Sequence, residues 1–223
     1  MSERPKLTVA RRPLHFFIVA DCSGSMAGDG RMRALNNAIR EALPHLRAVA
    51  EQNPHAELLV RAIAFSTGAR WHLAEATEVD ALRWLDLEAG GYSDLGAGLE
   101  LLAAELRVPP MPERALPPAI VLISDGMPTD DWRAALARLL DEPWGARSVR
   151  LAVGIGRQVD HEVLETFIGN PEIAPVTANN PEQLVRLLRW ASTHAGRAAS
   201  QPSIDLTVQP GDLFEVEISE TIW

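Results

Sequence analysis

The sequence predicts an α/β protein with a doubly wound, mostly parallel sheet that carries helices on both faces. Two observations support this prediction: short apolar runs recur along the chain, and segments of helical periodicity lie between them. Each run is rich in branched residues and bounded by polar residues or glycine, as is typical of strands buried on both faces. The expected strands are 16–20, 58–65, 119–123 and 149–155.

The helices are expected where apolar side chains recur at spacings of three and four residues, which places them on one face. In the first of these segments, Pro44 should kink the helix or mark its end. Helices that alternate with strands in this way predict right-handed crossovers between parallel strands. The expected helices lie within 32–49, 95–106, 136–140, 160–167 and 181–193.

The chain is expected to form one domain over residues 14–195, preceded by an N-terminal arm of residues 1–13. Residues 196–223 are expected to form a linker and a C-terminal β-hairpin. A small, polar stretch comes first, and two runs of alternating apolar and polar residues then flank Pro210-Gly211-Asp212. Because a lone hairpin is marginal in water, it should dock on the domain, on a second copy or on a partner.

Composition narrows the class of ligand and the compartment. The net charge of -9 argues against binding to nucleic acid or to an anionic membrane surface. No apolar run approaches the roughly 18 to 20 residues of a membrane helix. Cys22 is the single cysteine, which excludes an internal disulfide and fits a reducing cytoplasm. We therefore expect a soluble, cytoplasmic protein.

Polar side chains follow the predicted strands at the places where ligands bind in such sheets. An acid and two hydroxyls alternate directly after the first strand, so their side chains should point the same way. A hydroxyl stands at the start of the helix over 95–106, and another acid follows the third strand. The carboxyl ends of parallel strands meet at one edge of the sheet. The candidate site residues there are Asp21, Ser23, Ser25, Ser93 and Asp125.

Two carboxylates and three hydroxyls are hard oxygen ligands. They suit Mg²⁺ first, with Mn²⁺ or Ca²⁺ as alternatives, and do not suit zinc or copper. Two aspartates only balance the charge of a dication, so the ion would keep enough positive field to attract an external anionic oxygen. An open coordination position could then take an Asp or Glu side chain of a partner protein, which predicts a recognition site.

The spacing Asp21-x-Ser23-x-Ser25, the later hydroxyl of Ser93 and the strand-end acid Asp125 resemble a known motif. It is the metal-ion-dependent adhesion site (MIDAS) of von Willebrand factor A (vWA) domains. The resemblance covers roughly residues 14–195, and Ser93 stands where the family usually has threonine. Within the family, the chain is similar to TerY-type proteins of bacterial tellurite-resistance and stress operons.

The resemblance implies the Rossmann-like vWA fold and a divalent metal site. It implies direct or water-bridged metal contacts from Ser23, Ser25 and Ser93, with Asp21 and Asp125 supporting them from outside the coordination sphere. It also implies a cytoplasmic stress-response or signalling assembly. A protein kinase or phosphatase of the same operon is the partner that the resemblance suggests.

Simpler structural roles compete with metal binding at several positions. An isolated Asp-x-Ser-x-Ser is common in loops, where short polar residues satisfy turns. Ser93 and Asp94 could cap the helix that follows them. The default role of residues 129–131, Thr-Asp-Asp, is the N-terminal cap of the next helix. For Cys22, a small buried hydrophobic residue is the default.

The enzymatic alternatives fit the sequence less well than binding does. The glycine stretch 24–30 lacks the Lys-Ser/Thr pair of a phosphate-binding loop, and residues 91–95 match only half of a serine-hydrolase elbow. A metal-assisted phosphoesterase with Asp21 as nucleophile is the main alternative, but the acid expected two residues later is Ser23. We expect a binding module and not an enzyme.

Overall fold

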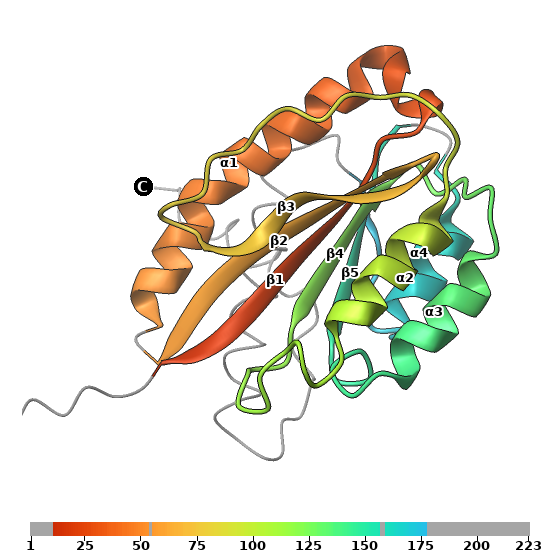
Figure 1. The fold of residues 1–223 in the computed structure, drawn as a ribbon. Coiled ribbons are helices and arrows are strands. Elements are labelled where there is room, and N and C mark those ends of the chain that lie inside the picture. Colours follow the sequence, from red (N-terminus) through yellow and green to blue (C-terminus); the bar gives the residue numbers. More distant parts are fainter. Residues whose placement is uncertain (1–10, 54, 157–158, 178–223) are drawn as a thin grey trace, which may run out of the picture.

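The computed structural model describes residues 11–53, 55–156 and 159–177. Within them a six-stranded sheet runs in the order β3-β2-β1-β4-β5-β6 (Figure 1). The strands are β1 (Arg12–Asp21), β2 (Ala56–Ser66), β3 (Gly68–Glu78), β4 (Ala119–Ser124), β5 (Val149–Gly154) and β6 (Val176–Thr177). The helices are the 3-10 helix η1 (Gly24–Gly30), α1 (Arg31–Gln52), α2 (Leu95–Glu105), α3 (Trp132–Asp141) and α4 (His161–Ile168).

Strand pairing gives the predicted doubly wound topology. β1 pairs in parallel with β2 on one side and with β4 on the other, and β5 and β6 continue in parallel beyond β4. The chain therefore builds one half of the sheet outward from β1 and then returns to the centre to build the other half. This confirms the mostly parallel α/β fold class and places the reversal of strand order between β1 and β4.

Helices cover both faces of the sheet, as predicted. Along β1, Phe16 and Ile18 face the core that contains α1, whereas Phe17 and Val19 face the core that contains α2, α3 and α4. Figure 1 shows α1 across one face and the other three helices together on the opposite face. These four side chains are at most 4% exposed. Burying each one contributes about 1.5–3 kcal/mol, which fixes β1 as the rigid centre of the fold.

The first helix differs from its prediction at Pro44. α1 continues past this residue to Gln52, so Pro44 does not mark its end. The Pro44 side chain is exposed, while Leu43 and Leu46 beside it are buried against the sheet. A proline inside a helix removes one backbone hydrogen bond. Apolar packing of the flanking turns holds the helix together in spite of that loss.

Two strands of the sheet are not among those expected from the sequence. β3 runs antiparallel to β2 at the edge of the sheet, and none of its side chains is buried. It therefore lacks the apolar run that identifies the central strands. β6 spans only two residues. The helix expected over 181–193, the C-terminal hairpin and residues 1–10 of the predicted arm lie outside the described residues.

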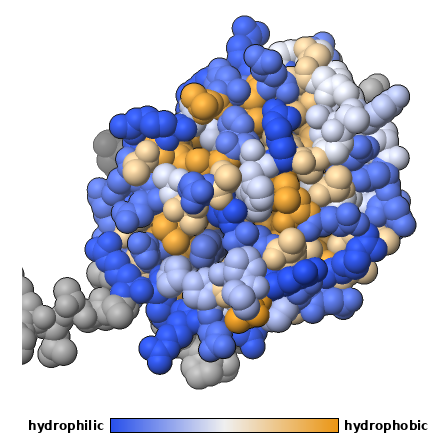
Figure 2. Space-filling view, in the orientation of Figure 1, coloured by the Kyte–Doolittle hydropathy of each residue, from blue (hydrophilic) through white to orange (hydrophobic). Residues whose placement is uncertain are grey.

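The surface in Figure 2 shows apolar patches between hydrophilic residues. Such a mixture is ordinary for a protein surface, because polar atoms alone cannot cover it. Within the described ranges, none of the helices combines the length and the apolar character that a bilayer crossing requires.

One buried polar side chain in the central strand has no hydrogen-bond partner. His15 of β1 is 6% exposed and stacks on Phe17, with 5.8 Å between ring centroids. Neither of its ring nitrogens finds a partner in the part of the chain that the structure describes. Burial, and secondly the positive charge of Arg61, lowers the pKa of His15 from 6.5 to about 4. The imidazole is therefore neutral in the folded protein at physiological pH.

His15 should make the protein less stable as the pH falls. Between pH 6.5 and about 4 the unfolded chain binds a proton that the folded chain excludes. Above pH 6.5, the ordinary pKa of His15 in the unfolded chain, this group should leave the free energy of unfolding unchanged. As the pH falls from 6.5 towards 4, the free energy of unfolding should drop by up to about 3 kcal/mol. Urea titrations of His15→Phe should show a flatter pH dependence in this window. The matched change at an exposed position, His55→Phe, should keep the wild-type slope, and an unchanged slope in His15→Phe would contradict the assignment.

Candidate functional site

The candidate site lies where strand order reverses, at the carboxyl ends of β1 and β4. Asp21 is the last residue of β1, and Asp125 directly follows β4. Ser93 lies in the connection that leads into α2. In doubly wound sheets this crevice is the usual position of a ligand. The fold thus brings together three segments that are distant in the sequence.

Backbone hydrogen bonds fix the β1 loop against the connection before α2. The Gly24 N–H donates to the Gly91 carbonyl at 2.9 Å, and the Gly90 N–H donates to the Cys22 carbonyl at 2.7 Å. The Cys22 side chain is 1% exposed, which confirms its expected role as a small buried residue. These bonds hold the loop that bears Ser23 in place, independently of any ligand.

Asp21 is the centre of the polar network. Its Oδ1 accepts a hydrogen bond from the Ser23 N–H at 2.8 Å. Its Oδ2 accepts hydrogen bonds from Ser124 Oγ at 2.6 Å and from Ser93 Oγ at 3.3 Å. The carboxyl group is fully buried, and this burial raises its pKa, while the hydrogen bonds from Ser124 and Ser23 act in the opposite direction. A single side chain thus connects all three segments.

The two serines after Asp21 point to the same side, as their spacing predicts. Ser23 Oγ and Ser25 Oγ lie 2.9 Å apart and share a hydrogen bond. Ser23 is 3% exposed, whereas Ser25 is open to solvent. The pair therefore leads from the buried carboxylate of Asp21 to the surface, which is the arrangement that a metal reached from outside would need.

Asp125 supplies the second carboxylate, and it is only partly satisfied. Its Oδ2 lies 3.5 Å from Arg31 Nη1, which also lies 3.4 Å from the Ser25 carbonyl. Its Oδ1 is buried and has no hydrogen-bond partner among the described residues. A buried carboxylate oxygen without a partner is costly, and a cation would satisfy it. This oxygen and the neighbouring hydroxyls therefore fit a hard divalent metal.

The structure brings all five predicted site residues to one edge of the sheet and adds two that were not predicted. Ser124 holds Asp21 through its hydroxyl, and it was available in the sequence as part of the strand-end motif. Arg31 contacts Asp125 from the first position of α1. A cation there opposes the helix dipole. That conflict with local preference is the signal that could have identified Arg31.

The predicted helix cap after β4 is confirmed for one of its three residues. Asp131 caps α3 by accepting a hydrogen bond from the Ala134 N–H at 3.3 Å. Asp130 caps a different helix, because its carboxylate accepts from the Gly96 N–H at 2.9 Å and the Ala97 N–H at 3.0 Å of α2. The prediction was therefore wrong for Asp130, whose partners lie far away in the sequence.

Thr129 and Asp94 also depart from simple capping. Thr129 Oγ1 accepts from the Ser93 N–H and donates to Asp94 Oδ1, both at 3.1 Å. The Asp94 Oδ2 accepts from the Gly68 N–H at 2.8 Å, and Asp94 makes no side-chain cap to α2. The suggestion that Ser93 and Asp94 merely cap this helix is therefore wrong for their side chains. Thr129 and Asp94 together fix the loop that presents the Ser93 hydroxyl to the site.

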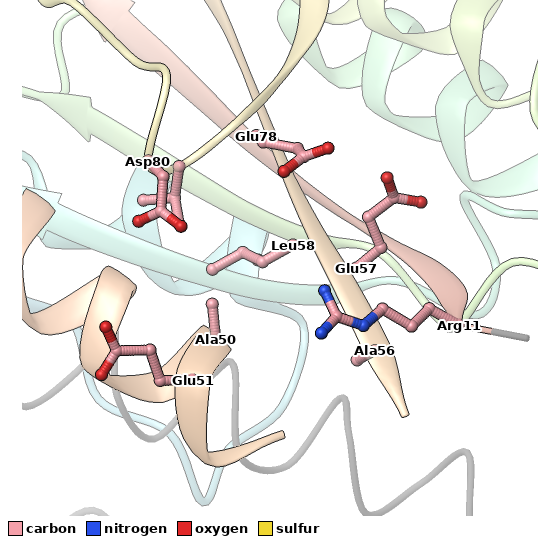
Figure 3. Close-up of a pocket in the computed structure, with 9 residues that line it drawn as sticks. Arg11, Ala50, Glu51, Ala56, Glu57, Leu58, Glu78 and Asp80 are labelled. Carbon is pink, nitrogen blue, oxygen red and sulfur yellow. The ribbon is translucent and has the colours of Figure 1, made fainter. Parts of the chain in front are cut away.

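A separate hollow of about 160 Å³ lies at the opposite end of the sheet. It forms where β1 and β2 begin and where α1 and β3 end (Figure 3). Ligands of doubly wound sheets bind at the carboxyl ends of the strands, and this hollow is at the amino ends. The charged residues that line it are Arg11, Glu51, Glu57, Glu78 and Asp80.

Gly126 positions Asp125 and should tolerate no side chain. Its φ is +80°, and a Cβ atom there would lie 2.7 Å from the Asp160 carbonyl oxygen. Gly126→Ala should lower the free energy of unfolding by about 3 kcal/mol, since strain and a backbone clash add together. Gly68→Ala is the matched control, because its φ is +74° with nothing within 4 Å of the added Cβ. It should lose only about 1 kcal/mol in chemical denaturation, and equal losses would show that the clash is relieved.

Comparison of the fold with solved structures finds several similar domains. A von Willebrand factor type A protein from Catenulispora acidiphila has 18% identity and a TM-score of 0.61, over 83% of this chain and 43% of that one. The open form of the pilus adhesin SpaC from Lactobacillus rhamnosus GG has 15% identity and a TM-score of 0.62, over 84% and 30%. BatB from Bacteroides thetaiotaomicron, described as a conserved hypothetical protein, has 13% identity and a TM-score of 0.58, over 82% and 99%.

At these identities, the likeness shows the fold alone. This chain spans less than half of the C. acidiphila protein, 43% of its length. A comparison with curated proteins finds no match. The model of the von Willebrand factor type A domain family, however, matches residues 16–189, which is well over half of the sequence. The chain therefore belongs to the von Willebrand factor type A domain family.

Proposed function

We propose that this chain is a metal-dependent protein-binding module whose divalent ion takes an acidic side chain of a partner protein. Domains of this family commonly mediate protein–protein contacts, often with a metal site. The observation that carries the proposal is the buried Oδ1 of Asp125, which has no hydrogen-bond partner among the described residues. A cation beside it would remove the cost of burying that oxygen unpaired.

The donor set suits Mg²⁺ in the first place, and Mn²⁺ or Ca²⁺ as alternatives, because all of its atoms are hard oxygens. The bound ion would supply a concentrated positive charge with one coordination position open to an external oxygen. The chain itself orients the donors through the Asp21 network and keeps the carboxylates out of bulk water. The residues that would hold the ion are Asp21, Ser23, Ser25, Ser93 and Asp125.

The low number of acids favours recognition over tight metal storage. Among the described residues, no group of three or more His, Cys, Asp or Glu side chains could hold a metal ion. Asp21 and Asp125 together would only balance the charge of a dication, and the three hydroxyls add none. An ion held in this way keeps a strong attraction for an anionic oxygen, which a partner's Asp or Glu would supply.

The position of Asp21 argues for binding and against phosphoester hydrolysis. A nucleophilic carboxylate needs an oxygen that can reach the substrate. Asp21 is fully buried, and both of its oxygens accept hydrogen bonds from Ser23, Ser93 or Ser124. We therefore propose that the chain is not an enzyme and that Asp21 organises the site.

The setting that we propose is a bacterial stress-response or signalling assembly in the cytoplasm. It rests on the similarity of the motif residues to TerY-type proteins of tellurite-resistance operons. In that setting, a protein kinase or phosphatase of the same operon is the partner class to examine first. The single, buried Cys22 is compatible with a reducing compartment.

Two exposed apolar side chains are close neighbours of site residues in the sequence. Tyr92, which precedes Ser93, is 69% exposed, and Met127, two residues after Asp125, is 51% exposed. Aromatic and methionine side chains are enriched in protein interfaces. We therefore propose that the partner presents its acidic residue between apolar neighbours, which would pack on Tyr92 and Met127.

Metal binding should be measured first, by titration calorimetry of Mg²⁺, Mn²⁺ and Ca²⁺ into metal-stripped protein. Saturable binding is expected for the wild type, and it should be lost in the Asp21→Ala, Ser23→Ala double variant. At free metal a hundred times Kd, thermal melts should show stabilisation of about 2.7 kcal/mol. Ser25→Ala removes a hydroxyl that is exposed, so it should weaken metal binding without loss of the fold.

Asp141→Ala is the control for nonspecific attraction, because it removes an exposed acid from the end of α3. It should bind metal as the wild type does. Absence of saturable binding by the wild type would overturn the proposed function. If Ser25→Ala and the double variant both bind metal as tightly as the wild type does, the metal lies elsewhere.

Partner chemistry can be tested with nine-residue peptides that carry a central Asp between apolar residues. In Mg²⁺ they should bind more tightly than peptides with serine flanks, and a central Asn or added EDTA should abolish binding. Tyr92→Ala and Met127→Ala should each weaken the apolar peptide roughly tenfold, about 1.4 kcal/mol. Leu85→Ala is the matched control. Leu85 is 72% exposed and lies, like Tyr92, in the connection between β3 and α2. Equal affinities of the three variants would contradict the apolar rim.

A further inference from the structure

We propose that Arg31 is a second, built-in cation of the candidate metal site, which weakens metal binding and strengthens binding of the partner's carboxylate. The inference rests on the proposed metal-dependent function and adds a residue that the motif does not contain. It is carried by the contacts of the Arg31 guanidinium, by its burial and by the charges around it.

The guanidinium of Arg31 lies at the edge of the site. Nη1 is 3.5 Å from Asp125 Oδ2 and 3.4 Å from the Ser25 carbonyl oxygen. Nη2 is 3.5 Å from Asp29 Oδ2. The Arg31 side chain is only 19% exposed, and its Nε is buried without a hydrogen-bond partner in the described part of the chain. Arg31 thus places its positive charge beside one carboxylate of the site.

The fold leaves room for this side chain at Gly156. A Cβ atom on Gly156 would lie 2.9 Å from Arg31 Nε and 3.1 Å from Arg31 Cζ. The lack of a side chain at this position, which follows β5, therefore lets the guanidinium lie over the edge of the sheet. Its placement involves both α1 and the loop beyond β5.

Stability of α1 does not account for a cation at this position, although Arg31 also follows η1 as its C-cap, where a positive charge is mildly favoured. Arg31 is the first residue of α1, where the helix dipole disfavours positive charge by about 0.3–1 kcal/mol. Its partner Asp29 has a side chain that is 87% exposed, and such a surface pair contributes little. The interaction that distinguishes Arg31 is the one with the buried carboxylate of Asp125.

The charges of the site give Arg31 two opposite effects. The buried carboxylates of Asp21 and Asp125 carry two negative charges, and Arg31 carries one positive charge. The charge of Asp29 is set aside in this count because its side chain is 87% exposed and water screens it. A divalent ion entering the site is therefore attracted by a net charge of one and not two. Once it is bound, the site has an excess positive charge that it would lack without Arg31. An incoming carboxylate would also be attracted by the positive charge of the guanidinium, which is more weakly hydrated than the ammonium of a lysine.

The test compares Arg31→Gln, Arg31→Lys and Arg33→Gln with the wild type. Arg33→Gln is the matched control, because Arg33 is exposed on the first turn of the same helix and its loss changes the net charge equally. In Mg²⁺ titrations, Arg31→Gln should bind about threefold to tenfold more tightly than the wild type, since a like charge has been removed. Arg31→Lys and Arg33→Gln should stay within about twofold of the wild type.

The second arm measures the Asp-centred peptide with apolar flanks on protein saturated with Mg²⁺. Arg31→Gln should bind it about tenfold more weakly, Arg31→Lys should be intermediate and Arg33→Gln should match the wild type. Tighter metal binding with weaker peptide binding cannot come from misfolding, which would lower both affinities. Thermal melts of the metal-free variants verify the fold.

The outcomes separate this inference from the function on which it rests. Failure of the wild type to bind metal overturns the site and the role of Arg31 together. Metal binding by the wild type with equal metal affinities of Arg31→Gln and Arg33→Gln overturns the role of Arg31 alone. A fall in metal affinity in Arg31→Gln would make Arg31 a structural support, and this also overturns the proposal. The metal titration decides these points whether or not the peptide binds.

Discussion

The buried carboxylate of Asp21 is the constraint on which the arrangement of this sheet edge depends. Its oxygens accept hydrogen bonds from Ser23 in the loop after β1, from Ser93 in the connection before α2 and from Ser124 at the end of β4. A carboxylate out of contact with water costs several kcal/mol unless it is hydrogen-bonded or paired. Moving any of these three segments would remove a donor from the Asp21 carboxylate. The loops are therefore held in one geometry before any ligand arrives.

The topology of the sheet is what makes that convergence possible. β1 lies between β2 and β4, and the pairing of Ala20 with Ile123 sets Asp21 beside Ser124 at the carboxyl edge. Two apolar cores fix β1 from both faces, so the strand end cannot shift to relieve the buried charge. On the β2 side, the Cys22 N–H bonds to the Phe65 carbonyl at 2.7 Å and extends the sheet into the loop. Packing thus supplies the rigidity that the polar network requires.

The features predicted from the sequence are those whose signal is local. The central strands carry short runs of mostly apolar residues. Asp21, Ser23 and Ser25 can be identified by their alternate spacing within five residues. The edge strand β3 is not buried and so has no such run. Asp130 caps α2 from 34 residues away in the chain, and no local pattern encodes that contact. The contact of Arg31 with Asp125 spans 94 residues of the chain, and no local pattern encodes it either.

The net negative charge of the molecule would repel the acidic partner proposed for it. The distribution of that charge over the molecule reduces this repulsion at the site. A net charge of -9 repels an acidic protein at long range. However, four carboxylates gather at the hollow by the amino ends of the strands (Figure 3). β1, with ten residues, separates the two ends of the sheet by about 30 Å. Charges beyond roughly 8 Å are largely screened in physiological salt. An approaching carboxylate would therefore respond chiefly to the charges near the site. Of these, the bound ion and Arg31 attract it, and Asp94, which lies behind Thr129 and Ser93, opposes them. The contribution of Arg31 depends on its closeness and not on the total charge.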